Sequence, residues 1–174
     1  MGTSSTSGRR HHRRTGLAEM DSAARVQTVC RSCDHVNVEL TAGDVERIPR
    51  GNLRVPRDEF VAVWHMAERM AHGDWYAVGV ATTCRWIACV SVPSIIPAHH
   101  GRREPARAPL TGTRFRAHEE LIEREAATAD LRLARNPSGI EHRPDWLEAI
   151  AATLDWAWRG SGRPPLDTHQ ANAG

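Results

Sequence analysis

The sequence contains no lysine, because all 23 of its basic residues are arginine. A chain without lysine has no Schiff-base lysine and none of the lysine that holds phosphate in P-loop enzymes. It also lacks the G-x-S-x-G, H-E-x-x-H and dinucleotide-binding patterns of common enzyme classes. Exclusive use of arginine is typical of GC-rich coding, which also explains the many alanines, glycines and prolines. The alternative is selection for binding nucleic acid.

Long apolar runs are scarce, and only residues 75–92 are apolar enough to be tested as a membrane segment. Arg85 stands in the middle of this run, where a charge costs roughly 2.5–3.5 kcal/mol on insertion scales. We therefore expect a buried core helix there and no membrane segment. The N-terminus lacks the apolar region of a signal peptide, and we expect the protein to be cytoplasmic.

Charge is unevenly distributed, although the formal net charge is only +2. Residues 1–16 carry four arginines and no acid, and residues 99–116 carry five arginines and one glutamate. Such basic segments are suited to contact phosphates or acidic surfaces, although many are simply solvated loops. The sequence predicts nucleic-acid or partner contacts at eight positions: Arg9, Arg10, Arg13, Arg14, Arg102, Arg103, Arg107 and Arg114.

Apolar periodicity predicts a mainly α protein, in which a four-helix domain follows a small N-terminal β-hairpin and both tails are disordered. The prolines and glycines of residues 93–112 predict a long irregular loop. The third helix is expected to begin near residue 113, with Phe115 on its apolar side. The four helices are expected at residues 58–72, 75–92, 113–135 and 144–160.

Four segments follow from these patterns. We expect the polar N-terminus to be a disordered basic arm and the next segment to form the hairpin with a Cys-x-x-Cys turn. The helical domain comes after it and ends in a flexible, proline-rich tail. Their predicted bounds are 1–20 for the arm, 21–55 for the hairpin subdomain, 56–160 for the helical domain and 161–174 for the tail.

The turn of this hairpin holds the pair Cys30 and Cys33, within the segment VCRSCDHVN. Two thiolates at this spacing can share one tetrahedral zinc ion, because the turn amides point at the sulfurs. The segment resembles half of a zinc-ribbon knuckle, although Asp34 stands where that pattern favours glycine. We predict one structural zinc ion with Cys30, Cys33 and His35 as ligands, while the fourth ligand that a tetrahedral site requires is left open. Simple thiols and a redox pair are the alternatives.

The other two cysteines, Cys84 and Cys89, are expected to be small buried side chains. Residues five apart on a helix diverge by about 140°, so this pair suits neither a disulfide nor one metal ion. Arg85 lies between them and should pair with a carboxylate. The candidates are Glu119, Glu120 and Glu123 of the third helix.

These features favour a non-enzymatic binding or accessory module, stabilised by zinc, that contacts nucleic acid or an acidic protein surface through its arginines. One alternative is a metal- or thiol-dependent enzyme with Cys30 and Cys33 at an open site. The other is a metal-free helical adaptor, for which an exposed Trp156 would be the sign.

Overall fold

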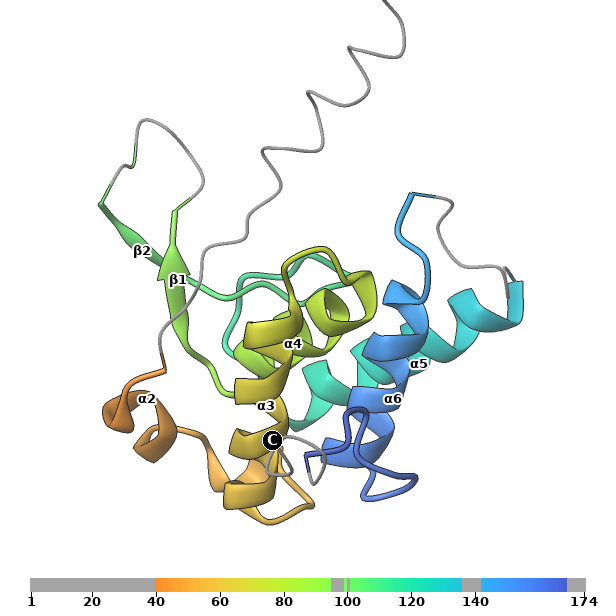
Figure 1. Ribbon diagram of the computed structural model, residues 1–174, viewed down its shortest axis with the longest axis horizontal. Helices are drawn as coiled ribbons and strands as arrows, with labels where there is room; N and C mark the ends of the chain where they lie inside the picture. Colours follow the sequence, from red (N-terminus) through yellow and green to blue (C-terminus); the bar gives the residue numbers. More distant parts are fainter. Residues whose placement is uncertain (1–39, 95–98, 100, 136–141, 169–174) are drawn as a thin grey trace, which may run out of the picture. The chain divides into compact units, whose positions relative to one another are not determined.

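The computed structural model describes residues 40–94, 99, 101–135 and 142–168. This part of the chain is mainly helical, as predicted (Figure 1). A short helix, α2, and a 3-10 turn, η2, precede four longer helices. Their bounds are Ala42–Glu46 for α2, Arg50–Asn52 for η2, Arg57–Met70 for α3, Trp75–Ile87 for α4, Glu119–Arg135 for α5 and Trp146–Ala157 for α6. The predicted knuckle hairpin and basic arm lie outside the described residues.

Helix α4 is the centre of the core, as its apolar sequence predicts. It packs against α3 and α6, and α6 packs in turn against α5. The Asp74 side chain caps its first turn by accepting the amides of Tyr76 and Ala77, at 2.8 and 3.3 Å. At Gly79, helices α4 and α6 meet so closely that a Cβ atom on this residue would lie 2.7 Å from the Trp146 carbonyl oxygen.

The core is built around large aromatic and aliphatic side chains, and Phe60, Trp64 and Trp86 are almost fully buried. Trp156 is only 4% exposed and stacks on Phe60, with ring centroids 6.2 Å apart. The exposed Trp156 that would have indicated a metal-free helical adaptor is therefore not observed, because its ring packs against Phe60 of α3.

Residues 40–55, assigned by the sequence to the knuckle subdomain, pack against the helices instead. Ile48 is 2% exposed. The buried Asn52 amide donates to the carbonyl oxygens of Ile87 (2.8 Å) and Ala117 (3.1 Å), which ties η2 to the end of α4 and to the segment before α5. Leu166, in the tail that was predicted to be flexible, also packs against the core.

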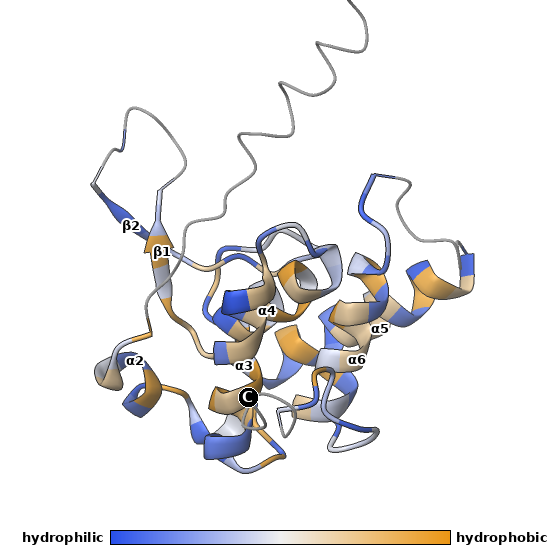
Figure 2. Cartoon of the chain, viewed as in Figure 1, coloured by the Kyte–Doolittle hydropathy of each residue, from blue (hydrophilic) through white to orange (hydrophobic). Residues whose placement is uncertain are grey.

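A two-stranded antiparallel sheet forms where the sequence predicted only irregular loop, because residues 103–105 of that loop pair with residues 91–93 (Figure 1). Residues 106–112 form neither helix nor strand. Strand β1 (Ser91–Pro93) pairs with β2 (Arg103–Pro105), and Val92 faces Glu104 in the register. The prolines that suggested a loop are tolerated because a two-stranded sheet has only edge strands. Figure 2 shows the contrast between the apolar centre of β1 and the hydrophilic β2.

Helices α4 and α5 are shorter than the sequence suggested. Helix α4 ends at Ile87 rather than near residue 92, because Cys89 adopts a left-handed backbone with φ of 56°. Helix α5 begins at Glu119 rather than at residue 113. Its fully buried Glu125 accepts the backbone amides of Leu110 and Thr111, which fastens the segment leading into the helix. Phe115, which was expected on the apolar side of this helix, therefore precedes it.

Candidate anion-binding site

The hairpin formed by β1 and β2, with the segment after it, carries several of the arginines that were predicted to contact a partner. Glu104 on β2 accepts a hydrogen bond from Ser94 at 2.7 Å and lies 3.3 Å from His99 Nδ1. Arg107 and Arg114 approach the same carboxylate at 3.7 and 3.9 Å. The Ser94 and His99 hydrogen bonds, with the nearby guanidiniums, lower the pKa of Glu104. One carboxylate thus faces two arginines.

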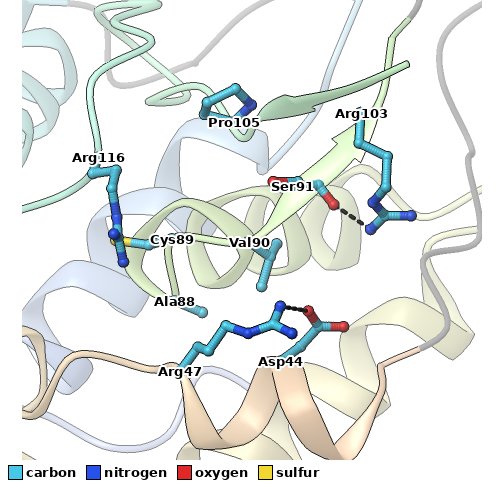
Figure 3. A pocket seen from close by; sticks show the side chains of 9 residues that line it. All are labelled: Asp44, Arg47, Ala88, Cys89, Val90, Ser91, Arg103, Pro105 and Arg116. Atoms are coloured by element: carbon cyan, nitrogen blue, oxygen red, sulfur yellow. Dashed lines mark hydrogen bonds and ion pairs between the residues drawn. The ribbon is translucent and has the colours of Figure 1, made fainter.

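A pocket of about 400 Å³ lies beside the hairpin (Figure 3). Three arginines from three different segments line it: Arg47 after α2, Arg103 on β2 and Arg116 before α5. Backbone and side chains of residues 88–91 form its base, and Asp44 is the acidic residue in its lining. The lining therefore carries two more positive than negative charges.

The three guanidiniums of the pocket differ in how much of their charge is compensated. Arg47 pairs with Asp44 at 3.4 Å, and this aspartate also forms the capping box of α2 with Thr41. Arg103 donates to the carbonyl oxygen of Ser91, a neutral acceptor that leaves its charge in place. Arg116 makes no hydrogen bond or ion pair with any residue that the structure describes. Two guanidiniums thus remain electrostatically available to an anion.

Cys89 also lines this pocket, where the sequence predicted a buried side chain inside a helix. Its sulfur lies 3.5 Å from the Ala117 carbonyl oxygen and 3.7 Å from the Asn52 amide nitrogen. Cys84, in contrast, is fully buried as predicted, and burial raises the pKa of its thiol well above the ordinary value. The two thiols therefore occupy different surroundings, and Cys89 is the one that borders open space.

The predicted zinc ligands, Cys30, Cys33 and His35, lie outside the described residues, as do Arg9, Arg10, Arg13 and Arg14. Within the described residues, no group of three or more histidine, cysteine, aspartate or glutamate side chains is arranged to hold a metal ion. The remaining contact candidates, Arg102, Arg103, Arg107 and Arg114, all belong to the hairpin and the segment that follows it.

Arg85 does pair with a carboxylate, but its partner was not among the candidates. Its Nε donates to Glu68 Oε1 at 2.7 Å, and a second nitrogen of the guanidinium contacts Oε2. Glu68 lies on α3 and is 6% exposed. The pair belongs to the α3–α4 interface rather than to the pocket.

Glu119, Glu120 and Glu123 instead line a second cleft, of about 480 Å³, between α5 and α6. The other lining residues are Arg124, Ala127 and Trp158, so this cleft is acidic where the first is basic. Trp158 donates to Glu123 at 2.8 Å, which together with Arg159 lowers the pKa of that carboxyl group. Glu119 pairs instead with Arg54 and Glu120 with His118, so none of the three is the partner of Arg85.

Sequence reasoning did not select Arg47, Arg116 or Cys89 as site residues. Arg116 stands in a segment recognised as basic, and its charge was a usable signal. Arg47 and Cys89 are distant in sequence from that segment, and only folding brings them to it. Neither periodicity nor charge pattern indicates such a contact.

In the part of the chain that the structure describes, no helix combines the length and apolar character needed to cross a membrane. No protein-family model, no curated protein and no solved structure matches the chain.

Proposed function

We propose that this protein is a non-enzymatic binding module that contacts nucleic acid through the arginines of the hairpin region. The observation that carries the proposal is the pocket lined by Arg47, Arg103 and Arg116, in which the one lining carboxylate, Asp44, is already paired with Arg47. Guanidiniums around such a pocket suit phosphate oxygens, because the planar fork donates two parallel hydrogen bonds. The pocket also falls within the roughly 300–1,000 Å³ range of ligand sites.

The surface around the pocket extends the positive charge. Arg102 is exposed just before β2, and Arg107 and Arg114 share Glu104. The four arginines of the N-terminal arm are proposed as further contacts to the phosphate backbone. Such contacts position a polyanion without reading its base sequence, so binding should be salt-dependent and weakly selective.

Within this proposal, one structural zinc ion at Cys30, Cys33 and His35 stabilises the knuckle and takes no part in chemistry. A structural zinc ion needs a fourth ligand beside these three, and zinc enclosed by four protein ligands contributes to folding rather than to catalysis. The expected cytoplasmic location is compatible with this assignment, since reduced thiols are the form that binds zinc.

The test is fluorescence anisotropy with a labelled 20-nucleotide single strand, measured over a range of salt concentrations. The variant Arg102→Gln/Arg103→Gln/Arg116→Gln should bind at least tenfold more weakly. Loss of three phosphate contacts should flatten the slope of log affinity against log salt by about 2. The matched control, Arg69→Gln/Arg124→Gln/Arg135→Gln, removes the same charge from exposed arginines of α3 and α5 and should change little.

Equal weakening by both triple variants would contradict a local site and indicate only a general charge effect. Polyglutamate serves as the probe for an acidic protein surface. If wild-type protein binds polyglutamate but not the oligonucleotide, the partner is an acidic protein and the nucleic-acid proposal is wrong.

A further inference from the structure

Phe115 is the most exposed large apolar side chain of the described residues, with 75% of its surface accessible. It makes no ring contact with another aromatic side chain in the described part of the chain. Its neighbours in sequence are Arg114 and Arg116, of which the second lines the basic pocket. Surfaces that bind single-stranded nucleic acid combine exposed aromatic rings with basic side chains, and this segment has the same combination.

The backbone that carries Phe115 is anchored on both sides, although it belongs to neither a helix nor a strand. The carbonyl oxygen of Phe115 itself accepts the indole N–H of the buried Trp86, at 3.4 Å. The Ala117 carbonyl accepts the Asn52 amide at 3.1 Å, and the Thr113 carbonyl accepts the Ala108 amide at 3.0 Å. The ring is therefore presented outward from a fixed segment, which reduces the entropy lost when a ligand binds.

Charge decides which kind of ligand this ring suits. Arg116 has no partner among the described residues, and Arg114 shares Glu104 with Arg107. An apolar protein partner would have to leave these guanidiniums facing its own surface, whereas a nucleotide offers a flat base and a phosphate together. Every base has a π face, so stacking of this kind tolerates any base sequence.

We propose that Phe115 stacks on an unpaired base while Arg116 and the adjacent pocket hold a neighbouring phosphate, which makes the module selective for single-stranded over double-stranded nucleic acid. A base inside a duplex is already stacked on both faces and is not available to the ring. This inference rests on the proposed function and adds to it the form of nucleic acid that is bound.

The experiment compares a labelled 15-nucleotide oligothymidylate with a duplex of the same length, using wild-type protein, Phe115→Ala, Phe115→Trp and the control Leu131→Ala. Leu131 is also exposed, at 49%, but lies on α5. Phe115→Ala should weaken single-strand binding roughly 5- to 150-fold, the range expected for one lost base stack. Duplex binding and the salt slope should not change. Phe115→Trp and Leu131→Ala should bind like the wild type.

Unchanged single-strand affinity in Phe115→Ala, or an equal loss for single strand and duplex, would overturn this inference while leaving arginine-dependent binding intact. Absence of any oligonucleotide binding by the wild type would instead overturn the proposed function. The two failures are therefore separate results of one titration series.

Discussion

Among single residues, Glu68 has the largest consequences for stability. Its buried carboxylate accepts the Trp64 indole N–H at 2.8 Å and the Arg85 Nε–H at 2.7 Å. Both charges are largely removed from water, since the side chains of Glu68 and Arg85 are 6% and 14% exposed. A pair in such surroundings does little net stabilising, but removing one member leaves the other without compensation.

We therefore expect Arg85→Met to lower the free energy of unfolding by about 3–5 kcal/mol, the usual cost of breaking a buried pair. The double variant Glu68→Gln/Arg85→Met should recover most of this loss, because a glutamine oxygen still accepts the Trp64 indole. Urea denaturation of wild type, both single variants and the double variant measures the coupling. If the two single losses simply add in the double variant, the residues are not energetically coupled.

At the scale of secondary-structure elements, the approach of α4 and α6 depends on Gly79. Its missing side chain leaves room for the Trp146 carbonyl and for the Ala149 Cβ, which would lie 2.7 and 2.8 Å from an added Cβ. These are backbone and short side-chain atoms that cannot move aside without shifting a helix. The interface is thus limited by backbone contact rather than by flexible side chains.

Gly79→Ala should reduce the free energy of unfolding by about 1–3 kcal/mol, as expected for overpacking, despite the better helix propensity of alanine. The matched control is Gly43→Ala in α2, where the nearest atom is the mobile guanidinium of Arg47, at 3.3 Å. That variant should stay within about 1 kcal/mol of the wild type. Thermal and urea denaturation measure both. A stabilised Gly79→Ala would show that the helices separate more easily than their contact suggests.

For the whole molecule, basic and acidic surfaces are built on different elements. The basic pocket is formed by α2, the hairpin and the segment before α5, whereas the acidic cleft is formed by α5 and α6. The net charge of the chain is only +2, because 21 acidic residues offset its 23 arginines. Net charge is therefore a poor guide to binding in this protein, and local charge is the informative quantity.

The zinc prediction also concerns the whole chain. Protein purified under reducing conditions should contain about one zinc ion per chain, as one tetrahedral thiolate site would hold. The variant Cys30→Ser/Cys33→Ser should lose the metal and melt at a lower temperature. Cys89→Ser, the control, should keep the metal. If the wild-type protein contains no zinc and the double variant melts at the same temperature as the wild type, Cys30 and Cys33 are ordinary thiols and the zinc prediction is wrong.

Much of the helical fold was predictable, because apolar periodicity and capping residues act locally. Phe60 and Trp64 lie about one helical turn apart, and Asp74 caps α4 from the position just before it, so both features can be recognised from nearby residues. The β1–β2 hairpin was not predicted, because the prolines of this segment are more typical of loops than of strands. The partner of Arg85 was missed because a buried carboxylate on α3 has the same sequence pattern as a solvated one.

Four features could be read from the amino-acid sequence alone: the helical class, the central position of α4, the absence of lysine and the basic character of residues 99–116. These follow from composition and from contacts within a few residues of one another. That Arg47, Arg103 and Arg116 line one pocket and that Phe115 is exposed could be learned from the three-dimensional fold alone. The arrangement depends on where α4 ends and on how Asn52 and Glu125 fasten distant segments, which no local pattern specifies.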